Sequence, residues 1–193
     1  MARPKEFDRT QVVKAAMDVF WLQGYEATSI SDLTRATSLQ PGSLYNTFGN
    51  KHALYLEALD YYLAHVGGSL FDVLDEPLPG LEAIERFFTM LIDVELNDTR
   101  RRGCFMQNAM MEHATSDPDV AQRACTGKEA GNAAFKRALQ RAQAAGEIQS
   151  DLNLDQIASF LGSIVYAVRT ASITTDDRAE LEGIVAVALS VLR

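Results

Sequence analysis

Residues 27–51 read ATSISDLTRATSLQPGSLYNTFGNK, a stretch with the pattern of two short helices joined by a tight turn. The first helix is expected over residues 29–37, because a serine that can cap a helix precedes apolar residues at helical spacing. Pro41 suits the first turn of a second helix, where its missing N–H costs nothing. This second helix is expected to begin near Gln40 and to end ahead of Gly49.

The second helix has two chemically different faces. Leu44 and Phe48 lie four residues apart on its buried side, and its other face carries small or planar hydrogen-bonding side chains. Such side chains can enter a major groove about 12 Å wide and meet base edges. Gly42 would let the helix backbone approach the DNA closely. Tyr45 and Lys51, at the edges of the helix, would contact the DNA phosphates. The residues expected to contact DNA are Thr28, Ser29, Ser31, Gln40, Gly42, Ser43, Tyr45, Asn46, Thr47 and Lys51. The alternative is a plain turn between two core helices, with Tyr45 packed and Lys51 solvated.

Residues 20–54 carry a longer pattern that resembles the DNA-binding domain of TetR-type repressors. The matching residues are Phe20, Gly24, Tyr25, Thr28, Ile30, Leu33, Ala36, Leu39, Gly42, Leu44, Tyr45, Phe48, Lys51 and Leu54. The resemblance covers about the first third of the chain. It implies an all-helical homodimer with a DNA-binding head and a separate ligand-binding body. Ser38 stands where the family usually has glycine, and Asn46-Thr47 replaces a commoner aromatic or histidine pair, so we expect an altered operator sequence.

An all-α fold of about nine helices is expected, since no segment shows the alternation of a strand. Residues 1–51 should form the DNA-binding domain and residues 52–193 the effector-binding and dimerisation domain. The helices outside the 27–51 stretch are expected at 8–23, 51–66, 81–96, 103–114, 119–145, 154–170 and 177–192.

Charge is unevenly distributed along the 193 residues. The net charge of −8 argues against a nucleic-acid partner at first sight, but residues 1–51 hold six Lys or Arg against five Asp or Glu. Residues 52–193 hold twelve against twenty-one, so the body carries the negative charge. DNA affinity should therefore depend on a dimer and fall steeply with salt. Arg3 and Lys5 could form an arm that reaches a minor groove, or could be merely solvated.

The chain shows no apolar run of the roughly 20 residues that a membrane span needs, and its N-terminus is charged. We therefore expect a cytoplasmic protein with no membrane partner. Neither a cofactor nor a metal site is expected, because no Cys-x-x-Cys or His-x-x-x-His spacing occurs.

Two apolar stripes near the C-terminus indicate a partner surface. One stripe could fill the core of a monomer, whereas two invite a second copy across a two-fold axis. The expected dimer interface is formed by Ile157, Leu161, Ile164, Val165, Val168, Ile184, Val187, Ala188 and Val191. An ordinary intramolecular core is the alternative, and the family resemblance favours the dimer.

An effector pocket is expected in the body, lined by aromatic, methionine and polar side chains. The candidates are Phe87, Phe88, Leu91, Cys104, Phe105, Met106, Gln107, Met110, Phe135, Tyr166 and Arg169. Cys104 follows Arg100, Arg101 and Arg102 at a helix start, where guanidinium groups and the helix N-terminus favour a thiolate. It could therefore sense electrophiles or oxidants covalently, or be a small buried hydrophobe. The run GCFMQNAMME also resembles the second helix of the body in a branch of TetR-type regulators, some of which respond to reactive small molecules.

The sequence thus favours a homodimeric transcriptional regulator, a repressor by family precedent, that binds a palindromic operator in double-stranded DNA and is released by a small-molecule effector. Enzyme chemistry is disfavoured, because the chain has no Gly-rich phosphate loop, nucleophile elbow or metal signature. A helical interaction protein whose helix-turn-helix no longer reads DNA is the remaining alternative.

Overall fold

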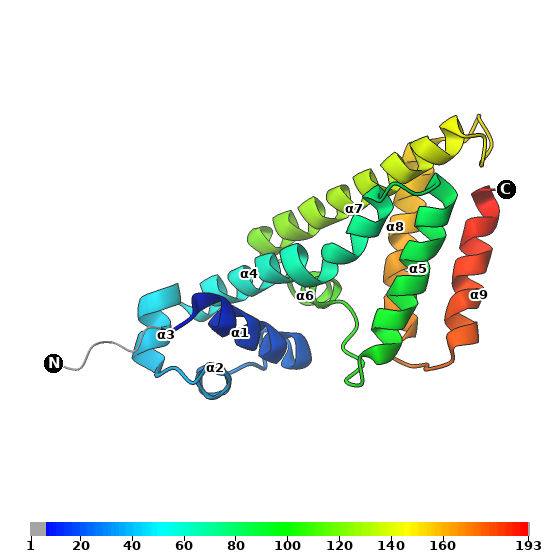
Figure 1. The fold of residues 1–193 in the computed structure, drawn as a ribbon. Helices are drawn as coiled ribbons and strands as arrows, with labels where there is room; N and C mark the ends of the chain where they lie inside the picture. The colour runs from blue at the N-terminus through cyan, green and yellow to red at the C-terminus, as the bar shows by residue number, and fades with distance from the viewer. Residues whose placement is uncertain (1–6, 193) are drawn as a thin grey trace.

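A computed structural model describes residues 7–192, and within that range the chain forms nine α-helices and no strand. The N-terminal helices are α1 (Arg9–Gln23), α2 (Ile30–Thr37), α3 (Pro41–Phe48) and α4 (Lys51–Tyr62). The remaining helices are α5 (Gly80–Asn97), α6 (Phe105–His113), α7 (Pro118–Ala144), α8 (Leu154–Ala171) and α9 (Arg178–Leu189). The elongated molecule carries α1–α3 at one end and α5, α8 and α9 at the other (Figure 1). This all-α architecture is the one that the sequence predicts.

Most helix starts are fixed by capping side chains that the sequence already displays. Asp8, Asn50, Asp117, Asn153 and Asp177 each accept hydrogen bonds from backbone N–H groups in the first turn of the helix that follows. At α2, Ser29 and Asp32 form a reciprocal capping box. These local signals explain why the observed helix boundaries lie close to those expected.

The segment after α4 departs from the expected continuous helix over residues 51–66. The α-helix ends at Tyr62 and widens into a π-helical turn, η1 (Leu63–Gly67), before a 3₁₀ segment, η2 (Ser69–Asp75). A Cβ at Gly67 would lie 2.7 Å from the Tyr62 ring, so a glycine is needed where the widened turn folds back over that ring. No helix is expected over residues 69–75 from the sequence. Short 3₁₀ segments lack the amphipathic period that reveals an α-helix.

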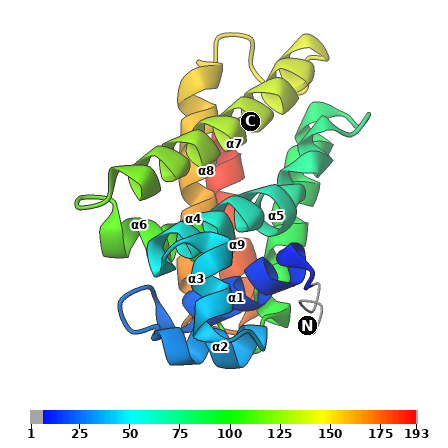
Figure 2. The same cartoon turned by 90° about the vertical axis from the view of Figure 1, so that its left-hand side faces the viewer.

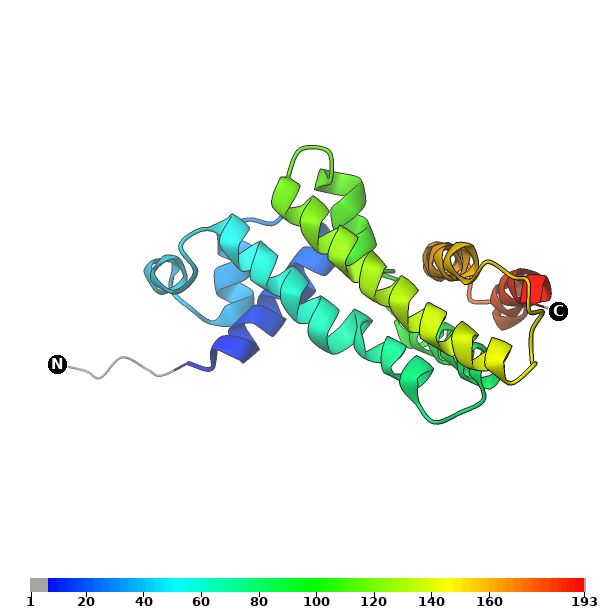
Figure 3. The same ribbon diagram turned by 90° about the horizontal axis from the view of Figure 1, so that it is seen from above.

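Two separate clusters of buried apolar side chains stabilise the molecule. The first joins α1–α4 with α6 and the start of α7, and includes Phe20, Leu44, Tyr55 and Phe105. The second joins η2, α5, α7, α8 and α9. Helix α7 contributes side chains to both clusters and lies beside α4, which leads through η1 into η2 of the second cluster (Figure 3). A displacement of α4 or α7 in one region therefore changes the packing in the other.

Among residues 7–192 no helix is long and apolar enough to cross a membrane. The expected arm at Arg3 and Lys5 lies outside the described residues.

Candidate nucleic-acid interface and ligand cavity

Helix α3 lies at the end of the molecule with one face on the core and the other in solvent (Figure 2). Leu44 and Phe48 are buried and anchor the helix, as their spacing predicts. Gln40, Gly42, Ser43, Tyr45 and Asn46 are exposed, and Thr47 is half-buried. A Cβ at Gly42 would meet no atom within 4 Å, so this backbone is open to an approaching duplex. The polar face of α3 is thus free to enter a groove.

Helix α2 presents fewer of the expected contacts. Ser29 and Ser31 are exposed, but Thr28 is buried, and its hydroxyl donates to the Gly24 carbonyl at 2.6 Å. The turn between α2 and α3 runs through Ser38 at φ 57°, the left-handed conformation that explains why glycine is usual there.

Lys51 lies half-buried inside the head. Its ammonium donates to the carbonyls of Tyr25 and Thr28 at 2.8 and 2.9 Å, and lies 4.2 Å from the centre of the Tyr25 ring. The lysine therefore ties the start of α4 to the α1–α2 loop. A phosphate contact by Lys51 stays a prediction, and it would have to share an ammonium that already has two protein partners.

Helix α6 is clamped to the head at both ends. Before its start, Arg102 pairs with Asp18 on α1 at 3.0 Å and stacks over Trp21, whose indole N–H donates to the Gly103 carbonyl at 3.2 Å. Near its end, Glu112 accepts hydrogen bonds from backbone N–H groups of the α1–α2 loop. A shift of α6 must therefore move or strain the head.

A cavity of about 480 Å³ lies between α4, η1, η2, α6, α7 and α8. Its apolar walls include Leu63, Phe71, Met106 and Val165. Gly131 on α7 allows close approach to η2, since a Cβ there would lie 3.0 Å from the Phe71 ring. The volume lies in the range typical of small-molecule sites, about 300–1,000 Å³.

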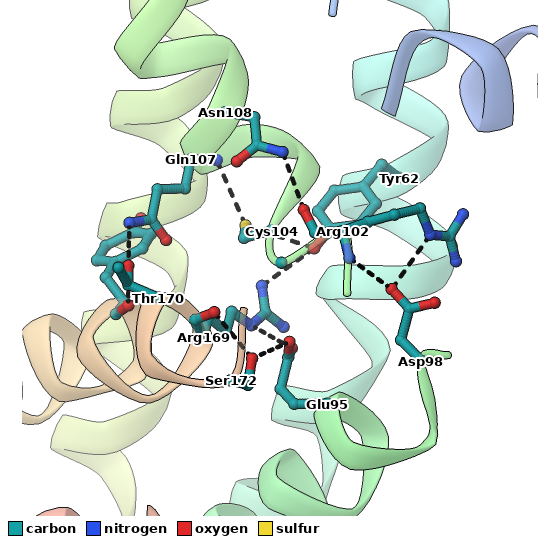
Figure 4. Close-up of polar contacts among 12 residues, drawn as sticks. Tyr62, Glu95, Asp98, Arg102, Cys104, Gln107, Asn108, Arg169, Thr170 and Ser172 are labelled. Atoms are coloured by element: carbon teal, nitrogen blue, oxygen red, sulfur yellow. Dashed lines mark hydrogen bonds and ion pairs between the residues drawn. The ribbon is translucent and has the colours of Figure 1, made fainter. Parts of the chain in front are cut away.

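One end of the cavity is a buried polar cluster contributed by α4, α5, α6 and α8 (Figure 4). Arg169 donates to the Tyr62 hydroxyl at 3.0 Å, and that hydroxyl donates to Cys104 Sγ at 3.4 Å. Behind Arg169, the Glu95 carboxylate lies 3.3 Å from Nε and accepts a 3.1 Å hydrogen bond from Ser172. The single guanidinium is thus neutralised from the side away from the cavity.

The environment of this cluster raises the pKa of Tyr62, Glu95 and Arg169, for different reasons. Burial raises the pKa of Tyr62 well above its usual value, so the phenol stays neutral and can donate. Burial also raises the pKa of Glu95, against the opposing effects of Arg169 and Ser172. For Arg169, burial disfavours the charge, but Tyr62, Cys104 and Glu95 outweigh it and raise the pKa.

Four of the eleven expected effector residues line this cavity: Cys104, Met106, Tyr166 and Arg169. Phe87, Phe88, Leu91 and Phe135 pack in the body core, and Phe105 packs in the head cluster. Met110 is half-buried against the head cluster, and Gln107 donates to Thr170 at 2.9 Å. Two of the arginines that precede Cys104 pair with carboxylates instead, Arg101 with Asp176 and Arg102 with Asp98 and Asp18.

Several residues at the cavity are not predicted from the sequence. Tyr62, Phe71 and Asn132 line the cavity, and Glu95 supports it from behind. From the sequence, Tyr62 is expected to be an ordinary core residue of α4, because the residues around it have the same pattern whether the side chain lines a cavity or packs in a core. A glutamate on the apolar face of α5 was an available signal, since buried carboxylates require a partner.

The expected interface residues divide into two groups. Leu161, Val165, Val168 and Ala188 are buried within the monomer, and Ile157, Ile164 and Ile184 are partly buried against the body core. Val187 on α9 is 73% exposed, Val191 in the 3₁₀ turn that follows α9 is 41% exposed, and Phe160 on α8 is 39% exposed. An apolar surface on α8 and α9 therefore remains uncovered in the single chain.

A helix-turn-helix head joined to a cavity-bearing helical body is the architecture of one-component transcriptional regulators, in which a single polypeptide carries both the DNA-binding and the ligand-binding part. Comparison with known families shows two matches: residues 12–58 match the model for bacterial regulatory proteins of the tetR family, and residues 80–187 match a tetracyclin repressor-like C-terminal domain. The chain belongs to the TetR family of transcriptional regulators.

Relatives and solved structures agree with this assignment along the whole chain. The uncharacterized HTH-type regulator YezE of Bacillus subtilis (strain 168) is 31% identical over 100% of both chains. The HTH-type transcriptional repressor ComR of Escherichia coli (strain K12) is 30% identical over 99% of this chain and 90% of its own. A cysteine mutant of the regulator CifR, solved with 26bp double-strand operator DNA, has a TM-score of 0.84 at 28% identity, with 100% of both chains covered.

Proposed function

We propose that this TetR-family regulator is a homodimeric repressor that binds a palindromic operator and is released when a small molecule occupies the cavity. The observation that carries the proposal is the position of α4. Its first residue, Lys51, is tied to the α1–α2 loop, and its last, Tyr62, lines the cavity. One helix thus connects the reading head to the ligand site. CifR bound to operator DNA and the repressor ComR support this assignment.

Release follows from a shift between two arrangements of the helices. An occupant that contacts Tyr62 and Cys104 acts on the end of α4 and the start of α6, and α6 is clamped to the head by Arg102 and Glu112. The effector needs only to favour an arrangement in which the two α3 helices lose operator spacing. The free energy available is the difference in its affinity for the two states.

The uncovered apolar surface on α8 and α9 supports the homodimer. Val187, Val191 and Phe160 would be removed from water at a symmetric interface, and a Cβ at the neighbouring Gly183 would meet nothing within 4 Å in the single chain. The half-buried Ile157, Ile164 and Ile184 would border it. A two-fold dimer would place two α3 helices about 34 Å apart, one turn of DNA.

The proposal assigns DNA reading to residues 1–51 and effector binding and dimerisation to residues 52–193. The buried contacts of the head with α6 and α7 then form the route between these two parts. We further propose that the cavity binds its occupant without chemical turnover. The regulator would act in the cytoplasm.

The direct test is selection of genomic fragments by the purified protein at near-physiological salt, followed by sequencing. We expect enrichment of one palindromic site. Absence of any enriched site from a folded, dimeric protein would overturn the repressor and favour the helical interaction protein.

A second version of the effector step is covalent. Cys104 lines the cavity with its sulfur beside the Tyr62 hydroxyl, so an α,β-unsaturated carbonyl compound held there could add to it: the S–C bond forms as the C=C π bond breaks, and the thiol proton passes to the α-carbon. Replacing Cys104 with Ser should leave operator binding intact and abolish release by such an electrophile. Unchanged release would eliminate this version.

A further inference from the structure

The charge distribution around the cavity limits what it can hold. The inner end contains one cation, Arg169, and that cation already has a buried counter-ion in Glu95. Both side chains are only 7% exposed, so water screens the pair weakly. A ligand carboxylate would add an unbalanced negative charge beside Glu95, and a ligand ammonium would add an unbalanced positive charge beside Arg169. Burying an unpaired charge is costly in either case.

The rim charges give an anion no net attraction. Three aspartates, Asp60, Asp72 and Asp75, line the cavity together with Lys128 and Arg137. Asp75 and Arg137 form a bidentate pair, with oxygen–nitrogen distances of 2.8 and 2.6 Å. The remaining rim charges are therefore Asp60, Asp72 and Lys128, and Asp60 is paired with Arg123 at 2.8 Å. No surplus of cations gathers at this opening among the described residues.

At the inner end, hydrogen-bond donors line the cavity, whereas the Glu95 carboxylate lies behind Arg169 and is not among the lining residues. The guanidinium of Arg169 has five N–H groups, which is more than its contacts with Tyr62, Glu95 and Cys104 require. Tyr166 adds a phenol on the same helix, and burial raises its pKa, so this hydroxyl also stays protonated and can donate. The surrounding walls are Leu63, Phe71, Met106 and Val165.

We propose, resting on the proposed function, that the effector is a neutral, mostly apolar small molecule with an acceptor oxygen, of the ketone, aldehyde or ester type, directed at Arg169 and Tyr166. Its hydrocarbon part packs on the aromatic and aliphatic walls. Its oxygen accepts from donors that otherwise face an apolar space, which gives the site its orientation and selectivity. Carboxylates and amines of the same length are excluded by charge.

The test compares three probes of equal chain length, 2-octanone, octanoate and octylamine, by calorimetric titration of the full chain without DNA. We expect 2-octanone to bind at least about tenfold more tightly than either charged probe. Equal or tighter binding of octanoate, or no binding of 2-octanone up to about 1 mM, would overturn the assignment.

Variants separate recognition of the oxygen from simple filling of an apolar space. Tyr166→Phe removes only one hydroxyl and should weaken 2-octanone binding about five- to tenfold, whereas Tyr61→Phe, outside this cavity, should not. The double change Arg169→Met with Glu95→Met removes both charges together and avoids leaving one buried alone. It should retain the fold and lose the preference for the ketone over octanoate. Unchanged affinity and preference in both cavity variants would contradict the proposal.

Release is measured separately on the selected operator. If 2-octanone binds but leaves the protein–DNA complex intact, the ligand class stands and the regulatory function fails. If the operator is bound and the ketone is not, the regulatory function stands and the ligand class fails.

Discussion

Glu112, near the end of α6, accepts a 3.1 Å hydrogen bond from the backbone N–H of Tyr25, in the loop that leads from α1 into the helix-turn-helix. The other carboxylate oxygen accepts from the N–H of Glu26 at 3.0 Å. A Cβ at Gly24 would lie 3.1 Å from the same carboxylate, so the loop approaches it closely. The body therefore holds the head by a contact that depends on the position of α6.

Glu112→Gln should loosen this contact. The amide keeps the size but loses the charge, and it weakens two hydrogen bonds, for a loss of about 1 kcal/mol. Amide hydrogen exchange at Tyr25 and Glu26 should become about fivefold faster, while amides in the middle of α7 keep their rates. An unchanged exchange rate in the loop would show that Glu112 does not hold it.

Tyr45→Ala tests the reading face of α3. The side chain is 43% exposed, so its removal should leave the melting temperature unchanged and weaken operator binding about tenfold. Leu22→Ala, an exposed apolar residue on α1, is the control and should keep full affinity. If Tyr45→Ala binds DNA as well as the wild type, the helical interaction protein becomes the better account.

Lys51→Ala should behave differently from Tyr45→Ala. Loss of the two hydrogen bonds to the Tyr25 and Thr28 carbonyls should lower the melting temperature as well as DNA affinity. Thermal unfolding followed by circular dichroism measures the difference. A variant that loses affinity at constant melting temperature would instead assign Lys51 to phosphate binding.

Val187→Asp tests the proposed homodimer. A carboxylate at this 73% exposed position leaves the monomer intact but places two charges near the two-fold axis. Sedimentation should show a monomer, and operator affinity should fall at least about tenfold. Val94→Asp, an exposed valine on α5, should remain dimeric. A dimeric Val187→Asp protein would place the interface elsewhere.

The Asp75–Arg137 pair gives a pH-dependent contribution to stability. The hydrogen bond from Arg137 lowers the pKa of Asp75, so the stabilisation is present above the unfolded pKa, about 3.9, and is lost as pH falls through the lower folded value. Both side chains are half-exposed, which limits the effect to about 1 kcal/mol or less. Asp75→Asn should be less stable than wild type at pH 7 in urea unfolding. A gap between the two proteins that persists undiminished below pH 3 would contradict this assignment.

The head could be predicted from the sequence because its signals are local. A capping serine, a proline in the first turn and apolar residues four apart define α2 and α3 within about twenty residues. The cavity could not, since its polar end joins Tyr62 to Arg169, 107 positions away along the chain. Phe87 and Phe135 show the same limit: their spacing marks a buried face, and only the fold decides whether that face meets a cavity or another helix.

Hydroxyl-radical footprinting of the selected operator tests the central claim most directly. A symmetric dimer with two reading helices should protect two patches on one face of the duplex, centred about 10 base pairs apart. Tyr45→Ala at matched concentration should lose both patches together. A single protected patch, or uniform protection along the fragment, would contradict a dimeric regulator that reads a palindrome.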